Sequence, residues 1–172
     1  MRDQSHRLRT ELDLLPATPA SFSALDTEPK EFTRLTRRAL SAYGDLPRLV
    51  ASPLTRLPVI EQRMPDGEGG SLQRAAGLKK LLAEAIDRLK PDSPEAFGSS
   101  DEWRHYNSLY FPYVAGIRPY SRRLGRLPTD GTLREAMKWF AAAVPERTLH
   151  NWQNEAAALI ARHLRELENP ST

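Results

Sequence analysis

The chain contains no cysteine among its 172 residues. Disulfide bonds, thiolate metal ligands and cysteine nucleophiles are therefore excluded. No apolar run approaches the ~18 residues that a membrane-spanning helix needs. The first residues, Met1–Arg7, are polar and do not lead into the apolar segment of a secretory signal. These absences predict a cytoplasmic protein that does not cross a membrane.

Patterns of catalytic and metal-binding residues are also missing. The histidines are His6, His105, His150 and His163, and no pair has the short helical spacing of a zinc site. We expect His105 and His150 on the surface and His163 in the core. Ser100, Asp101 and His105 are too close in sequence to converge as a triad, and Gly67–Gly70 lacks the pattern of a phosphate loop. We therefore expect no enzyme activity, no metal and no cofactor.

What the sequence does contain is helical periodicity interrupted by 14 prolines. The spacing predicts helices over 2–15, 28–43, 46–51, 54–57, 72–89, 100–116, 132–143 and 145–168. Asp45, Ser52 and Ser71 are expected caps, and Pro112 should kink or end its helix and shape a pocket beside it. Because no long run alternates apolar and polar residues, we predict an all-α bundle with a C-terminal helix-turn-helix and a long final helix. The expected divisions are an arm (1–27), a helical bundle (28–116), a basic loop (117–131) and the helix-turn-helix (132–168).

The helix-turn-helix is predicted from its caps and its two apolar stripes. Thr132 with Glu135 forms a capping box, and Val144-Pro145 ends the first helix. The expected inner faces are Leu133, Ala136, Met137, Phe140 and Ala141 on the first helix, and Leu149, Trp152, Ala156, Leu159, Ile160, His163, Leu164 and Leu167 on the second. A short helix, a tight turn and a longer helix is the layout of DNA-binding readers.

In such readers the start of the second helix meets base edges in the major groove of duplex DNA. The residues expected to point outward there are Arg147, Thr148, His150, Asn151, Gln153 and Asn154. Arginine pairs well with guanine, and asparagine or glutamine with adenine. These six residues are the candidate base-reading set.

Positive charge is concentrated just before this unit. Residues 104–138 carry seven basic and two acidic side chains. The candidate phosphate contacts are Arg118, Arg122, Arg123 and Arg126 in the loop, with Arg134 and Lys138 on the first helix. Such contacts position a protein on DNA and make its binding depend on salt.

Other interpretations stay open. Two helices and a short turn occur in any helical bundle, and Glu146 and Glu155 would repel phosphate. The aromatic run Trp103, Tyr106, Tyr110, Phe111 and Tyr113 is either core or a platform for single-stranded nucleic acid. Its helical spacing favours the core.

The chain also resembles a bacterial helical module that continues into a helix-turn-helix similar to region 4 of sigma factors. The resemblance covers about residues 40–167 and rests on Ala51-Ser52-Pro53-Leu54, Glu84–Pro91, Trp103–Leu109 and Tyr113–Gly116. The closing part of the module matches Glu135–Leu164. The family's helix pair follows the Val-x-Gly turn almost at once, whereas here residues 117–131 intervene.

The module occurs in regulators, sometimes fused to signalling or conflict-type ATPases, so the resemblance implies a regulatory DNA-binding role. Together with the base-reading and phosphate sets, it predicts a non-enzymatic regulator of double-stranded DNA. Readers of this kind usually act as homodimers on paired half-sites. The alternative is an adaptor of a signalling or defence complex, with a structural helix-turn-helix and residues 1–27 as an arm that docks on a protein partner.

Overall fold

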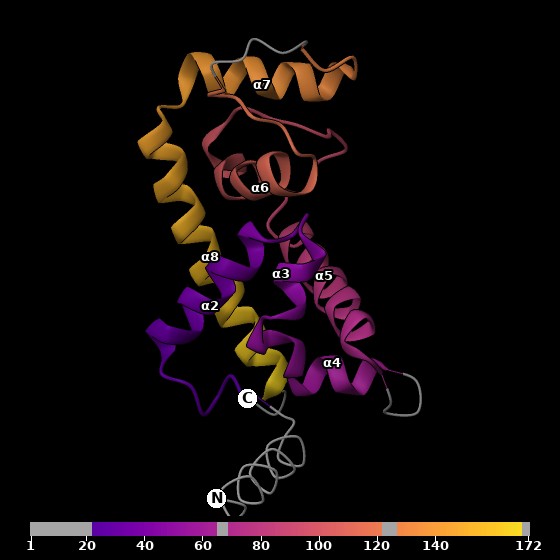
Figure 1. Ribbon diagram of the computed structural model, residues 1–172. Coiled ribbons are helices and arrows are strands. Elements are labelled where there is room, and N and C mark those ends of the chain that lie inside the picture. Colours follow the sequence, from indigo (N-terminus) through magenta and orange to yellow (C-terminus); the bar gives the residue numbers. More distant parts are fainter. Residues whose placement is uncertain (1–21, 65–68, 122–126, 170–172) are drawn as a thin grey trace, which may run out of the picture.

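The computed structural model describes residues 22–64, 69–121 and 127–169 (Figure 1). These residues form helices and connecting turns without a strand, which confirms the expected all-α fold. None of the helices in the described ranges is long and apolar enough to cross a membrane. The helix expected over 2–15 lies outside the described residues.

The first part of the fold follows its proline and capping signals. Its elements are α2 (Pro29–Ser41), α3 (Leu46–Val50), the 3-10 helix η1 (Pro53–Arg56) and α4 (Pro58–Arg63). The Asp45 carboxylate accepts the Arg48 backbone N–H at 3.2 Å, and the Ser52 hydroxyl accepts that of Leu54 at 3.2 Å. Both predicted caps are thus confirmed. The sequence did not indicate α4, which is too short to show an apolar stripe.

The middle of the chain contains an irregular helix. Its elements are α5 (Ser71–Asp87), the 3-10 helix η3 (Asp101–Trp103), α6 (Arg104–Leu109) and the π-helix η4 (Tyr110–Val114). Helix α5 begins at Ser71, with Gly70 in place of the expected cap. The regular α-helix ends at Leu109, three residues before Pro112, and Pro112 lies in the wider π turn that follows; Gly116 then closes the segment with a φ of +80°.

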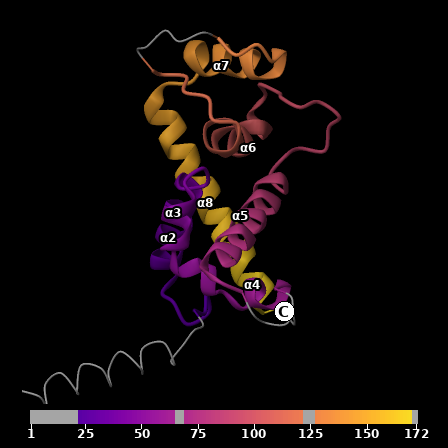
Figure 2. The same ribbon diagram turned by 45° about the vertical axis from the view of Figure 1, so that its right-hand side comes forward.

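The last two helices are α7 (Gly131–Ala143) and α8 (Glu146–Glu168). Helix α7 lies across one end of the molecule, and α8 runs from it to the opposite end, where the carboxyl terminus lies (Figures 1 and 2). Helices α2 and α6 make the most extensive contacts with α8. The expected boundary at residue 132 is therefore no boundary of the core, because α8 belongs both to the helix-turn-helix and to the bundle.

Residues 22–27, the described part of the expected arm, are packed against the rest of the fold. Ala24 is fully buried, and its backbone N–H donates to the Glu168 carboxylate at 2.9 Å. The Arg165 guanidinium donates to the Ala24 carbonyl at 2.7 Å, and the rings of Phe22 and Phe32 stack at 6.3 Å. The expected arm boundary at residue 27 is thus wrong for residues 22–27, which the end of α8 holds in place.

Two leucines of α5 give a matched test of the core. Leu82 is fully buried, whereas Leu72 is 63% exposed. Leu82→Ala is expected to lower the free energy of unfolding by about 2–5 kcal/mol, because it removes buried surface and leaves a cavity. Leu72→Ala should change it by less than about 0.5 kcal/mol. Urea unfolding followed by circular dichroism measures both, and equal losses would contradict this packing.

Candidate nucleic-acid interface

A two-residue turn joins α7 to α8, as the sequence predicts. Val144 is extended, with φ −122° and ψ 103°, and Pro145 precedes the first residue of α8. The predicted cap of α7 is wrong by two positions. Asp130 caps the helix by accepting the Leu133 backbone N–H at 3.0 Å, so Thr132 lies inside the first turn.

Aromatic side chains hold α7 against α8 and the rest of the molecule. The rings of Trp139 and Trp152 stack at 6.0 Å with an interplanar angle of 17°, and Phe97 meets Trp139 edge-on at 5.6 Å. Ala136 and Phe140 are buried as expected, whereas Ala141 is exposed. The predicted apolar stripe of α7 is therefore correct except for Ala141.

The amino-terminal half of α8 lies along the outer edge of the molecule in both ribbon views (Figures 1 and 2). Arg147, His150 and Asn151 are exposed there, and Thr148 is half-buried. Arg147, His150 and Asn151 are thus exposed as expected and Thr148 only in part, while their role in base reading stays a prediction. Their side chains can reach a ligand without any rearrangement of the core.

Gln153 does not belong to this exposed face. Only 6% of its surface is exposed, so the prediction that it points outward is wrong. Its amide Nε2 donates to the Ser108 carbonyl at 3.0 Å. That carbonyl lacks its usual α-helical donor four residues later, because Pro112 has no backbone N–H. Gln153 thus supplies the hydrogen bond that the proline removes.

Arg37 of α2 completes this network, which we call the Arg37 clamp (Arg37, Ser108, Tyr113, Gln153 and Asn154). Its guanidinium donates to the Gln153 side-chain oxygen at 2.9 Å, to the Asn154 side-chain oxygen at 3.1 Å and to the Tyr113 hydroxyl at 2.8 Å. Asn154 is exposed, as predicted, but its side-chain oxygen is already engaged. Two of the six predicted base-reading residues therefore take part in holding α8 in place.

The first part of the predicted basic loop lies beside the α7–α8 turn. Ile117 is buried, Arg118 is exposed, and the Tyr120 hydroxyl donates to the Val144 carbonyl at 2.7 Å. Burial, and to a smaller extent the Glu146 carboxylate, raise the pKa of Tyr120 above its usual range. Tyr120 thus tethers this segment one residue before Pro145. Arg122, Arg123 and Arg126 lie outside the described residues.

Helix α7 adds two exposed cations. Arg134 and Lys138 are both exposed on it, as the phosphate prediction requires. The Arg134 Nε also donates to the Pro128 carbonyl at 3.1 Å, which fixes the end of the loop against the helix.

Two carboxylates near the start of α8 reduce its attraction for anions. Glu146 and Glu155 are both exposed. Glu155 reaches the ring of His105 on α6 at 2.9 Å, so it is directed away from the edge of α8 and toward α6. His105 is half-buried rather than fully at the surface. Glu146 is thus the carboxylate that a phosphate backbone would meet first.

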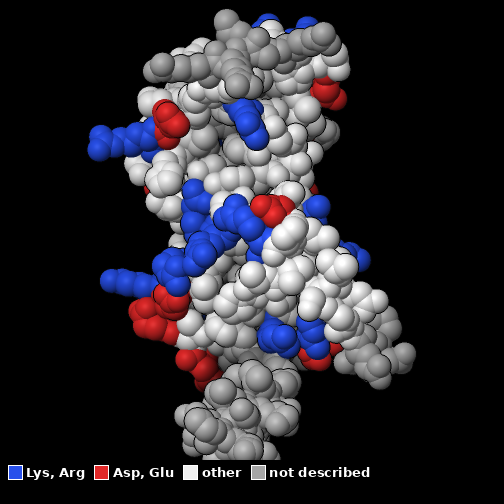
Figure 3. Space-filling model, viewed as in Figure 1, with Lys and Arg blue, Asp and Glu red and all other residues white. Residues whose placement is uncertain are grey.

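Sequence reasoning missed a second basic surface, the α2 basic face (Lys30, Arg34, Arg37 and Arg38). Figure 3 shows lysine and arginine side chains in a band over α2, beside α8. The four residues recur at helical spacing, which was the available signal. A count of net charge does not reveal this basic surface, because Glu28 and Glu31 lie among its residues in the sequence.

The aromatic run belongs mainly to the core. Trp103, Tyr106 and Phe111 are buried, and the rings of Tyr106 and Tyr110 stack at 5.1 Å. The core interpretation is therefore confirmed for these residues. His163 is half-buried, and burial lowers its pKa, as expected for a histidine on an apolar face. Within the described ranges, no group of three histidine and carboxylate side chains could hold a metal ion.

A hollow of about 390 Å³ lies between α5 and the segment formed by α6 and the π-helix, but Pro112 is not among its lining residues, so the pocket expected beside Pro112 stays a prediction. Tyr106, Tyr110 and Val114 line one side of it, and Lys80 and Asp87 lie on the other. Because a lysine and an aspartate both line it, its charge favours neither anions nor cations.

Comparisons of the chain with models of protein families, with curated proteins and with solved structures give no match. The candidate interface therefore rests on the chemistry of its own residues.

The link between Pro112 and Gln153 predicts non-additive stability effects. Gln153→Ala should lower the free energy of unfolding by about 1–3 kcal/mol, because it leaves the Ser108 carbonyl and part of Arg37 buried without partners. In the Pro112→Ala background the loss should be smaller, because residue 112 then has an N–H for that carbonyl. Urea unfolding of the two single variants and the double variant measures the coupling. Asn151→Ala is the control on the exposed face of α8, and additive losses would contradict the proposed pairing.

Proposed function

We propose that the protein binds duplex DNA through the α7–α8 unit, with the amino-terminal face of α8 in the major groove. The observation that carries this proposal is the Tyr120–Val144 hydrogen bond, at 2.7 Å. It brings the start of the basic loop beside the start of the candidate reading helix. A segment tethered on the far side of the molecule could not contact phosphates that flank the same groove.

We assign separate roles in base and phosphate contact to the exposed residues. Arg147, His150 and Asn151 are the proposed base-contacting residues, with Thr148 contacting a base or a phosphate. Arg118, Arg134 and Lys138 are the proposed phosphate contacts within the described residues. Gln153 and Asn154 are assigned to the Arg37 clamp instead.

A regulatory role follows from the resemblance to modules that end in a sigma region 4-like helix-turn-helix, and it is part of the proposal. So is a homodimer, in which two reading helices would lie about 34 Å apart on successive turns of DNA. In such complexes phosphate contacts supply most of the affinity and base contacts supply the selectivity, so a reading helix with little net charge is compatible with DNA binding.

Sequence preference should depend on the exposed start of α8. Selection from a random duplex pool at low salt is expected to enrich a motif, and Arg147→Ala or Asn151→Ala should relax the preference at one or two positions by about 1–3 kcal/mol. Arg162→Ala is the matched control, because Arg162 is an exposed arginine farther along the same helix. Fluorescence anisotropy with the enriched and scrambled duplexes measures the difference. If no motif is enriched and no duplex is bound, the DNA proposal is wrong and a role as a protein-interaction module is favoured.

Phosphate contacts should behave differently. Arg118→Ala is expected to weaken enriched and scrambled duplexes alike and to reduce the slope of log affinity against log salt by about 1. Glu146→Gln should strengthen both, because it removes a carboxylate that faces the DNA backbone. A salt titration of anisotropy tests both variants. A loss confined to the enriched duplex on Arg118→Ala would contradict its assignment to phosphate.

A further inference from the structure

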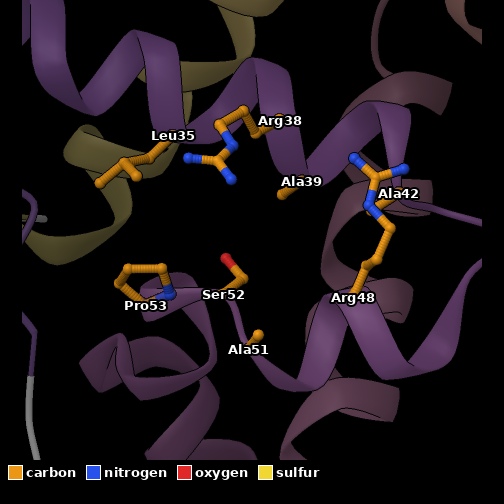
Figure 4. Close-up of a pocket in the computed structure, with 8 residues that line it drawn as sticks. All are labelled: Leu35, Arg38, Ala39, Ala42, Arg48, Ala51, Ser52 and Pro53. Carbon is orange, nitrogen blue, oxygen red and sulfur yellow. The ribbon is translucent and has the colours of Figure 1, made fainter.

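A second feature of the surface lies away from the α7–α8 turn, between α2 and the α3–η1 corner. It is a cavity of about 230 Å³, several times the ~30 Å³ that one water occupies in the liquid. Its lining comprises Leu35, Arg38, Ala39 and Ala42 from the α2 side, and Arg48, Ala51, Ser52 and Pro53 from the α3–η1 side (Figure 4). We call it the α2–α3 cavity.

The polar groups of this cavity all suit an anion. Figure 4 shows the Arg38 guanidinium directed toward Ser52 on one side, and the Arg48 guanidinium on the other side beside Ala42. No ion pair joins either arginine to a carboxylate of the described residues, whereas Arg34 of the same helix pairs with Glu31 at 2.6 Å. The Ser52 hydroxyl accepts the Leu54 N–H at 3.2 Å, so its own proton is available to a ligand.

Nearby acids do not neutralise the two guanidinium groups. The Asp45 carboxylate accepts the backbone N–H of Arg48 at 3.2 Å as the cap of α3. Glu31 lies seven residues before Arg38 and so on a similar side of α2, but both of its carboxylate oxygens accept from Arg34, and Arg38 makes only the smallest contribution to lowering its pKa. Arg38 and Arg48 are exposed, and neither forms an ion pair with a carboxylate of the described residues, so both guanidinium groups can bind an anionic ligand.

The middle of the cavity is apolar. Leu35, Ala39, Ala42 and Ala51 line it, with Pro53 beside Ser52. The alanines leave space that larger side chains would fill. An apolar body between two anionic groups would match this lining.

From this arrangement we propose that the α2–α3 cavity binds a short aliphatic dicarboxylate, with one carboxylate on Arg38 and Ser52 and the other on Arg48. Guanidinium groups bind carboxylates through paired, charge-assisted hydrogen bonds. The methylene chain lies against Leu35, Ala39, Ala42 and Ala51. This inference does not rest on the proposed DNA binding, because none of these residues belongs to the α7–α8 unit.

Adipate, hexanoate and hexanamide are suitable probes, since they share six carbons and carry two, one and no charges. Titrated into the ¹⁵N-labelled full chain, adipate should cause saturable shifts of the backbone amide signals of Ala39, Ala42 and Ala51. We expect adipate to bind about tenfold or more tightly than hexanoate, with hexanamide weakest.

Arg38→Gln and Arg48→Gln should each reduce adipate affinity roughly to that of hexanoate, because each variant leaves one carboxylate unpaired. Lys30→Gln is the matched control, an exposed cation on α2 outside the cavity. Ala51→Leu should block binding by filling the apolar middle without touching either charge. The spectrum of each free variant reports whether it is folded.

Three results would overturn the proposal. Equal affinities for adipate and hexanoate would show that the second arginine takes no part. An equal loss for Lys30→Gln and Arg38→Gln would show attraction to general surface charge. The absence of saturable shifts at these alanines would show that the cavity does not bind dicarboxylates. Since DNA is absent from the experiment, none of these outcomes bears on the proposed function.

Discussion

A hydrogen-bond network that ties the long helix α8 to its neighbours is built around one backbone carbonyl that a proline leaves without its helical donor. Pro112 removes the N–H that would bond to Ser108, and Gln153 of α8 donates to that carbonyl at 3.0 Å. Arg37 of α2 then binds the other end of the same amide at 2.9 Å. A buried polar group without a partner costs about 1–3 kcal/mol, so the loss of one side chain from this network would leave its hydrogen-bond partners at that cost. The network therefore ties α2, α6 and α8 in one relative position.

This constraint decides which face of α8 is open to a ligand. With Gln153 turned inward and Asn154 bound to Arg37, the candidate base-contacting side chains that remain exposed and unengaged by the clamp are those of Arg147, His150 and Asn151. The stacked rings of Trp139 and Trp152 fix α7 against the same helix. A reading helix must be held rigidly if its side chains are to distinguish base edges, and both contacts serve that requirement.

Local signals in the sequence were sufficient for most helix boundaries and failed where partners are distant. Proline and cap residues fixed the starts of α2, α3 and η1, because each acts within three residues of itself. The inward position of Gln153 could not be foreseen, since its partners lie 45 and 116 residues away and a stripe of apolar residues assigns glutamine to the outside. Asp130 caps α7 in place of Thr132, and because both residue types are good helix caps the sequence alone does not distinguish between them. The hydrogen bond from Tyr120 to Val144 could not be predicted, since the sequence pattern does not distinguish a buried tyrosine in a basic loop from an exposed one.

Helix α2 connects the two surfaces for which we propose ligands. Arg37 faces α8 and Arg38 faces the α2–α3 cavity, as expected for successive residues about 100° apart around a helix. A ligand in the cavity can change the affinity of α8 for DNA only if the protein has two conformations that differ in the position of α2 and the ligand binds them with different affinities. The Arg37 clamp opposes any such movement, because a shift of α2 would have to break hydrogen bonds to Gln153, Asn154 and Tyr113 together. Ligand binding and DNA binding are therefore expected to be independent while the clamp is intact, and weakening the clamp is the change that would couple them.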